Sequence, residues 1–99
     1  MKKFICIEPT TDAGEYTAHV HEARRYTSFQ LDGDLDNDTD EVLIKVPSLE
    51  GWKQAYDKAG NKLVLTNLAN HITVIGMGIF KFEKPASPGG NSGLIWWRR

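Results

Sequence analysis

The chain is most apolar and most β-branched between residues 62 and 85, which read KLVLTNLANHITVIGMGIFKFEKP. Short runs of Val, Ile, Leu and Phe are separated here by Asn and Gly, and a Pro closes the stretch. Runs of this kind, bounded by such residues, are typical of β-strands. Gly76 and Gly78 permit a tight turn, because glycine adopts positive φ without steric cost. The stretch therefore predicts the central β-meander of an all-β domain.

Strand patterns continue on both sides of this stretch. Residues 15–21 alternate, with Tyr16, Ala18 and Val20 on one face, which predicts a strand with one solvated face. A bulge or short turn is expected at 22–25, and the turn at 76–78 separates two strands of the meander. The remaining strands are expected at 3–8 (ended by Pro9), 26–31, 41–46 (ended by Pro47), 63–66, 71–75, 79–83 and 94–97.

Residues 48–59 fit two structures. Ser48 could cap a helix over residues 49–59, with Gly60 as its C-cap. Alternatively, residues 52–57 form a strand that a turn at 58–61 joins to the next strand. Gly51 in the first turn and the short length disfavour the helix. With the hairpin, the sequence predicts about eight to nine short strands in an antiparallel sandwich or barrel, with residues 1–99 as a single β domain.

Composition excludes several classes of protein. A formal net charge of −1 gives no overall field toward nucleic acid or an anionic membrane, and neither is expected as a partner. The apolar run at the N-terminus is too short for a secretory signal, and no run approaches the roughly 18 apolar residues of a membrane span. Cys6 is the one cysteine, so an intrachain disulfide is excluded, and it is expected to be a small buried or half-buried hydrophobe.

An acidic run between residues 32 and 41 is the most conspicuous polar feature. Closely spaced carboxylates suit calcium, which prefers oxygen ligands. The EF-hand register fails, because counted from Asp32 the sixth residue is Asn37 where that loop needs Gly. We expect a solvated loop or one that docks on a basic neighbour, and an irregular calcium site is the alternative. The candidate contact residues of this loop are Asp34, Asp36 and Asp38.

His19 and His21 place two imidazoles on one strand face, a spacing that holds a metal if another strand supplies a third ligand. His71 or Glu22 could supply it, but the Glu that a cupin-type site needs beyond the second His is missing. Exposed histidines are the preferred interpretation, and no metal or other cofactor is expected. The sequence also lacks a nucleotide loop and any nucleophile with a nearby base, so we expect no enzymatic activity.

The C-terminal residues mix aromatic and cationic side chains. Only one of two adjacent tryptophans in an alternating strand can face the core, so the other needs another partner. Trp and Arg are preferred anchors of protein interfaces, which favours a protein–protein contact over nucleic-acid binding. Removal of residues 94–99 is then expected to abolish binding. The candidate residues at the chain ends are Phe4, Trp96, Trp97, Arg98 and Arg99.

The segment from Trp52 to Pro85 resembles small virion proteins of tailed bacteriophages. In these, a strand pair leads into a segment of the form G-x-G-aromatic-x-x-x-K-P, followed by a Gly-rich loop and a last strand; here Gly76, Gly78, Phe80, Lys84 and Pro85 carry the pattern. The resemblance covers roughly the C-terminal half. It implies a compact β-sandwich or barrel of the capsid-decoration (cement) or head-fibre type.

The resemblance also implies an expected function. We expect a non-enzymatic structural protein of a phage particle, made in the host cytoplasm and located in the virion. Its expected partner is the major capsid protein or another virion protein on the capsid or tail, and it is expected to form homo-oligomers. The alternatives are a β-module that binds sugar or calcium through the acidic loop or the histidine face, and a small inhibitor of a host protein.

Overall fold

The computed structural model describes residues 2–20, 26–75 and 78–98. These residues form nine strands and no helix, as the sequence predicts. No segment of this part of the chain is a helix long and apolar enough to cross a membrane. The strands are β1 (Phe4–Thr10), β2 (Gly14–Val20), β3 (Tyr26–Gly33), β4 (Val42–Ser48), β5 (Gly51–Gln54), β6 (Val64–Leu65), β7 (His71–Ile75), β8 (Gly78–Lys84) and β9 (Ser92–Arg98).

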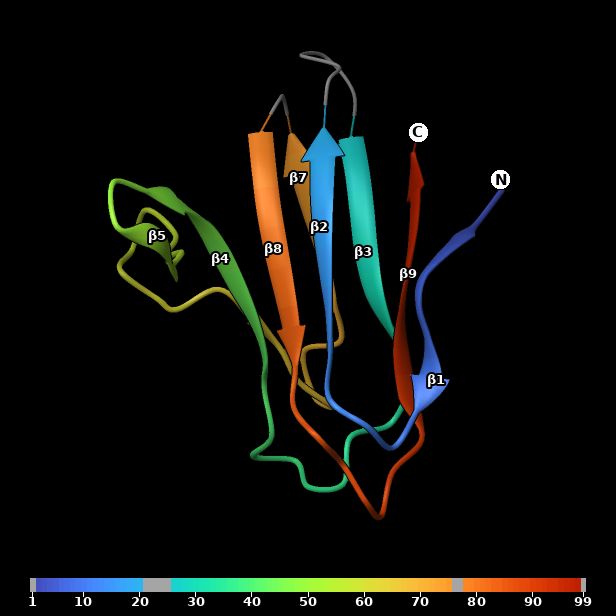
Figure 1. Ribbon diagram of the computed structural model, residues 1–99. Coiled ribbons are helices and arrows are strands. Elements are labelled where there is room, and N and C mark those ends of the chain that lie inside the picture. The colour runs from blue at the N-terminus through green and yellow to red at the C-terminus, as the bar shows by residue number, and fades with distance from the viewer. Residues whose placement is uncertain (1, 21–25, 76–77, 99) are drawn as a thin grey trace.

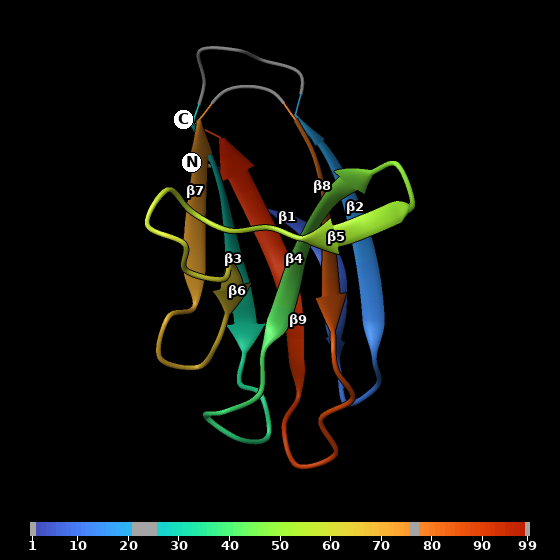
Figure 2. The ribbon, with the colours of Figure 1, turned by 90° about the vertical axis from the view of Figure 1, so that its left-hand side faces the viewer.

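The strands form two sheets, and every pairing is antiparallel (Figures 1 and 2). The first sheet, which we call sheet A, has the strand order β1-β9-β3-β7. The second, sheet B, has the order β2-β8-β4-β5, and β6 also pairs with β4. The two inner faces enclose the core, so the fold is the antiparallel β-sandwich that the sequence predicts.

The core consists of alternate residues from both sheets, as expected for strands that bury one face. Phe29 of sheet A and Phe82 of sheet B are buried in contact, with ring centroids 4.6 Å apart. Ile44 and Leu94 are also almost fully buried. Because burial of each such side chain contributes about 1.5–3 kcal/mol, these contacts hold the sheets together.

The strands predicted within residues 62–85 exist, but the prediction that they form a meander is wrong. β7 pairs with β3 in sheet A, whereas β8 pairs with β2 and β4 in sheet B. β6 pairs with β4, so no two strands of residues 62–85 are paired with each other. The stretch is apolar because it supplies strands to both sheets. Of the turn predicted at 76–78, residues 76 and 77 lie outside the described residues, and Gly78 begins β8.

Two predicted strand ends are also wrong, because both prolines lie inside strands. Pro9 is near the end of β1, an edge strand whose register shifts between Ile5 and Ile7 and again between Ile7 and Thr10. Pro47 pairs with Trp52 in β5, beyond the part of β4 that pairs with β8. Proline lacks an N–H donor and is tolerated at edges and bulges, which is where both residues lie.

Residues 48–59 contain a strand, so the helix alternative is wrong. The predicted hairpin is wrong in its partner, because the strand is β5 and pairs with β4, while residues 52–57 and 62–65 are joined only by a bridge between Tyr56 and Lys62. β5 pairs with Lys45–Ser48 to form a hairpin that projects from the sandwich in Figure 1, and we call residues 45–54 the arm. After the arm, the expected turn at 58–61 brings Tyr56 opposite Lys62. Gln54 fixes the base of the arm, because its side-chain nitrogen lies 2.8–3.1 Å from the carbonyl oxygens of Ile44, Ala55 and Leu63, which share its two N–H groups.

Candidate interaction surfaces

β9 places its two tryptophans on opposite faces of sheet A. Trp96 is paired with Phe29, faces the interior and packs against the core. Its ring also stacks on Phe4, with centroids 4.8 Å apart and planes at 22°. Trp97 points to the outer face, where its neighbour in register on β3 is Ser28. Of the two, Trp97 is therefore the one that a partner can cover.

Trp97 belongs to an apolar surface that the sequence analysis did not identify. Side chains two residues apart share a face of a strand, so the pairings Ile5↔Ile95 and Tyr26↔Ile75 put these four residues on the outer face with Trp97. Ile75 is 68% exposed, Ile5 57% and Tyr26 48%. We call these five residues the outer apolar face. They come from four strands that are distant in the sequence, and only the strand register reveals them.

The outer face of sheet B is mostly charged, although Ile79 on β8 is also 40% exposed there. Lys45 on β4 forms an ion pair with Glu83 on β8 (3.0 Å). Lys81 on β8 lies 3.5 Å from the same Glu83 and 3.3 Å from Glu15 on β2. Trp52 of the arm lies under Lys81, with the ammonium 5.5 Å from the ring centroid. A face covered by paired charges suits solvent, so the contrast singles out sheet A as the side for a partner.

Cations gather beside the aromatic residues near the two chain ends. The Lys3 ammonium lies 5.0 Å from the Trp97 ring centroid, and Lys2 lies 5.4 Å from that of Phe4. The Arg98 guanidinium lies 5.3 Å from the Trp96 ring centroid and is exposed. Arg99, the remaining candidate at this end, lies outside the described residues. We call Lys2, Lys3 and Arg98 the basic rim of this end of sheet A; Lys3 lies at the outer apolar face, whereas Lys2 and Arg98 lie over the inward-facing Phe4 and Trp96 rings.

The acidic loop lies at the other end of the sandwich from this basic rim (Figure 1). Its carboxylates are exposed, but its backbone is held in place. Asn67 accepts from the N–H of Leu35 (2.7 Å) and donates to its carbonyl (3.0 Å), which fixes that buried side chain. The N–H of Asp36 donates to the hydroxyl of Ser87 (3.1 Å), which joins the acidic loop to the loop before β9.

The structure therefore does not bring all the predicted contact residues together. Asp38 accepts from the Asn67 amide at 3.2 Å, while the Asp36 carboxylate lies beside Gly89 and only the backbone carbonyl of Asp34 lies near Gly90. Nowhere in the described residues do three or more His, Cys, Asp or Glu side chains form a group that could hold a metal ion. His19 lies on the exposed face of β2, and His21 falls outside the described residues.

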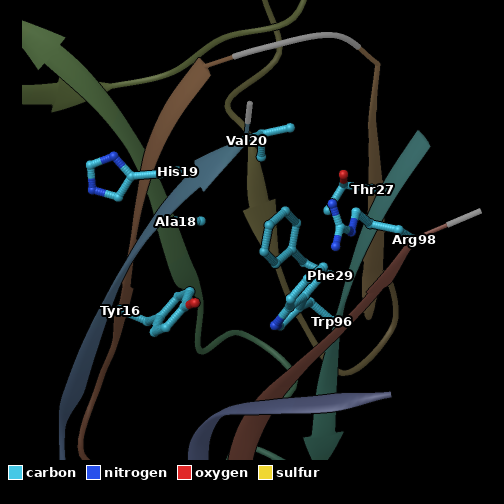
Figure 3. A pocket seen from close by; sticks show the side chains of 8 residues that line it. All are labelled: Tyr16, Ala18, His19, Val20, Thr27, Phe29, Trp96 and Arg98. Carbon is cyan, nitrogen blue, oxygen red and sulfur yellow. The ribbon is translucent and has the colours of Figure 1, made fainter. Parts of the chain in front are cut away.

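A small pocket lies between the two sheets where β2, the edge strand of sheet B, passes β3 and β9 (Figure 3). Its volume is about 80 Å³. Thr27 lines it and is only 2% exposed, yet its hydroxyl has no hydrogen-bond partner among the described residues. His19 is at its border but points away from the other lining side chains. The others are Tyr16, Ala18, Val20, Phe29, Trp96 and Arg98.

Comparison with known proteins supports the fold and leaves the family open. No protein-family model matches the chain, and no curated protein matches it. Among solved structures, the chain is similar to the crystal structure of the SPBc2 prophage-derived protein YomS. The TM-score is 0.54 at 15% sequence identity, over 99% of this chain and 92% of that one. At this identity, the similarity establishes a shared β-sandwich fold.

Proposed function

We propose that this protein is a non-enzymatic structural component of a phage particle that binds another virion protein through the outer apolar face. The observation that carries the proposal is the unequal character of the two outer faces, one apolar and one covered by ion pairs. Two further points support it. The structurally similar YomS is prophage-derived, and residues 52–85 resemble small virion proteins of tailed phages.

The size of the outer apolar face fits attachment in many copies. Four strands about 4.8 Å apart and about five residues long make a face of roughly 300 Å². A stable pairwise complex buries about 800 Å² on each partner. The outer apolar face is therefore the centre of a larger contact, and polar residues around it must supply the remaining buried area. Repeated sites on a particle compensate for modest affinity at each one, because linked contacts raise the effective concentration.

The basic rim specifies the partner further. Lys2, Lys3 and Arg98 lie around the aromatic residues at this end of the sandwich. A partner with an apolar depression bordered by carboxylates would complement them, and such charge matching sets orientation and association rate. We assign this partner to the major capsid protein or another virion protein, and the protein itself to the virion.

Mutation of the outer apolar face tests the proposal. Trp97→Ala removes the largest side chain of the face, and Ile75→Asp places a charge on it where the native residue is mostly exposed. We expect both variants to bind purified particles lacking the native protein at least 10-fold more weakly, because loss of a central aromatic anchor costs about 2 kcal/mol or more. Co-sedimentation at increasing protein concentration measures the binding.

Trp52→Ala is the matched control, because it removes the same kind of side chain from the arm of the other sheet, where Trp52 is 37% exposed. It should bind particles as the native protein does. Melting curves verify that all three variants are folded. The proposal is wrong if Trp97→Ala and Ile75→Asp occupy particles normally, or if mass spectrometry of purified particles from infected cells does not detect the protein.

A further inference from the structure

The tip of the arm carries an apolar side chain that its turn does not require. Ser48 pairs with Gly51, so Leu49 and Glu50 form the tip. Gly51 has φ of 113°, which only glycine adopts readily, and Ser48 donates its hydroxyl to the Gly51 carbonyl at 3.2 Å. Turn tips favour small polar residues, yet Leu49 is fully exposed there. The turn is thus held by its flanking residues and displays Leu49 to solvent.

The small pocket has the right volume for such a side chain. A cavity of about 150 Å³ takes benzene, which has six carbon atoms. The pocket of about 80 Å³ therefore suits about half as many, and Leu49 has three carbon atoms beyond Cβ. Ala18, Val20 and Phe29 provide apolar walls. The pocket and the side chain match in size and in polarity.

Two polar groups of the pocket match the tip as well. The buried Thr27 hydroxyl has no hydrogen-bond partner in the described part of the chain, and the exposed backbone of a turn can supply one. Arg98 borders the pocket with a positive charge, and Glu50 follows Leu49 directly with a negative one. In Figure 1 the arm leaves the sandwich on the side of β4 and β8, whereas the pocket lies toward β2 and β9. One molecule therefore presents the two halves of the contact on different sides.

We propose that the arm of one copy inserts Leu49 into this pocket of a second copy. Such a contact joins two different surfaces, so a pair of copies still has one free tip and one free pocket with which to continue the assembly. Contacts of this head-to-tail kind produce a closed ring or an open chain. The inference concerns contacts between copies and is independent of the proposed contact between the outer apolar face and the particle.

A mixing experiment tests the inference. Leu49→Asp removes the tip side chain but keeps the pocket, and Ala18→Leu fills the pocket but keeps the tip. We expect the native protein to associate with increasing concentration in sedimentation velocity, and each variant alone to remain monomeric. Because a mixture still contains one intact tip and one intact pocket, we expect it to form a 1:1 dimer that does not grow.

Exchange of the two charges provides a second test that leaves the apolar walls of the pocket intact. Glu50→Arg and Arg98→Glu should each weaken association at least 10-fold, and the double variant should recover most of it. Trp97→Ala is the control and should associate as the native protein does. The inference is wrong if the native protein is monomeric up to about 1 mM, if Leu49→Asp associates normally, or if neither the mixture nor the double variant restores association.

Discussion

Cys6 illustrates, at the scale of a residue, how burial controls chemistry. It lies on β1 beside Tyr16 of β2, and burial raises the pKa of its thiol to about 12 from 9.0, with the hydrogen bond to Tyr16 opposing this in part. Burial and the nearby Cys6 also raise the pKa of the Tyr16 phenol. A reactive cysteine needs a lowered pKa, so Cys6 is a structural residue. The sequence already indicates this, since Cys6 stands between two isoleucines.

These pKa shifts predict how stability depends on pH. Between pH 9 and 12 the unfolded chain loses the thiol proton while the folded protein keeps it, so the free energy of unfolding falls as pH rises. The slope should stay below the value for one full proton, about 1.4 kcal/mol per pH unit, because Cys6 is only half-buried and solvent screens the shift. We expect urea unfolding at pH 8, 9 and 10 to show this fall in the native protein and a shallower fall in Cys6→Ala. Parallel profiles for the two proteins would contradict the prediction.

At the scale of an element, the arm depends on one side chain. The Gln54 amide contacts three carbonyls where the chain leaves β5. It therefore joins β4 and the end of the arm to the segment around Leu63 that precedes β6. The N–H of Ala55 donates to Ile44 (3.0 Å), and that of Leu63 donates to Ala55 (2.9 Å). Without Gln54 the three carbonyls lose their shared donor and these backbone bonds open more often.

Gln54→Ala should therefore loosen the arm without unfolding the sandwich. We expect amide exchange at Ala55 and Leu63 to be at least 10-fold faster than in the native protein, with Phe82 unchanged. The melting temperature should fall by only a few degrees. Lys53→Ala, a neighbouring exposed residue, serves as the control and should change neither. Uniform acceleration across both sheets would show that the arm and the sandwich unfold together.

Local pattern predicts strands well and their partners poorly. Residues 71–75 form a strand with the predicted bounds, and residues 14–20 alternate as expected. In contrast, the pairing of Phe4 with Trp96 joins opposite ends of the chain, and no local pattern specifies it. For the same reason the sequence identifies Trp97 as a contact residue but misses Ile75, which joins the outer apolar face only through the register of three strand pairs.

At the scale of the whole molecule, the pairing of β9 with β1 and β3 shows that the C-terminal residues are part of the fold. The sequence suggests a tail that could be removed to test binding. In the structure residues 94–98 belong to β9, which lies between β1 and β3 in sheet A, and residue 99 is outside the described part of the chain. In the part of the chain that the structure describes, β1 pairs with no strand other than β9, and Leu94 is 1% exposed. The proposed contact residue Trp97 thus lies on a strand that the fold requires.

We therefore predict that a chain lacking residues 94–99 does not fold. Loss of Leu94 alone should cost about 2–5 kcal/mol, and the whole protein has only about 5–15 kcal/mol of stability. The truncation also removes Trp96 from the core and leaves β1 without a partner strand. We expect a collapsed amide NMR spectrum and no cooperative melting transition, whereas Trp97→Ala keeps both signals. A dispersed spectrum from the truncated chain would show instead that the other strands suffice, and residues 94–99 would again be a dispensable tail.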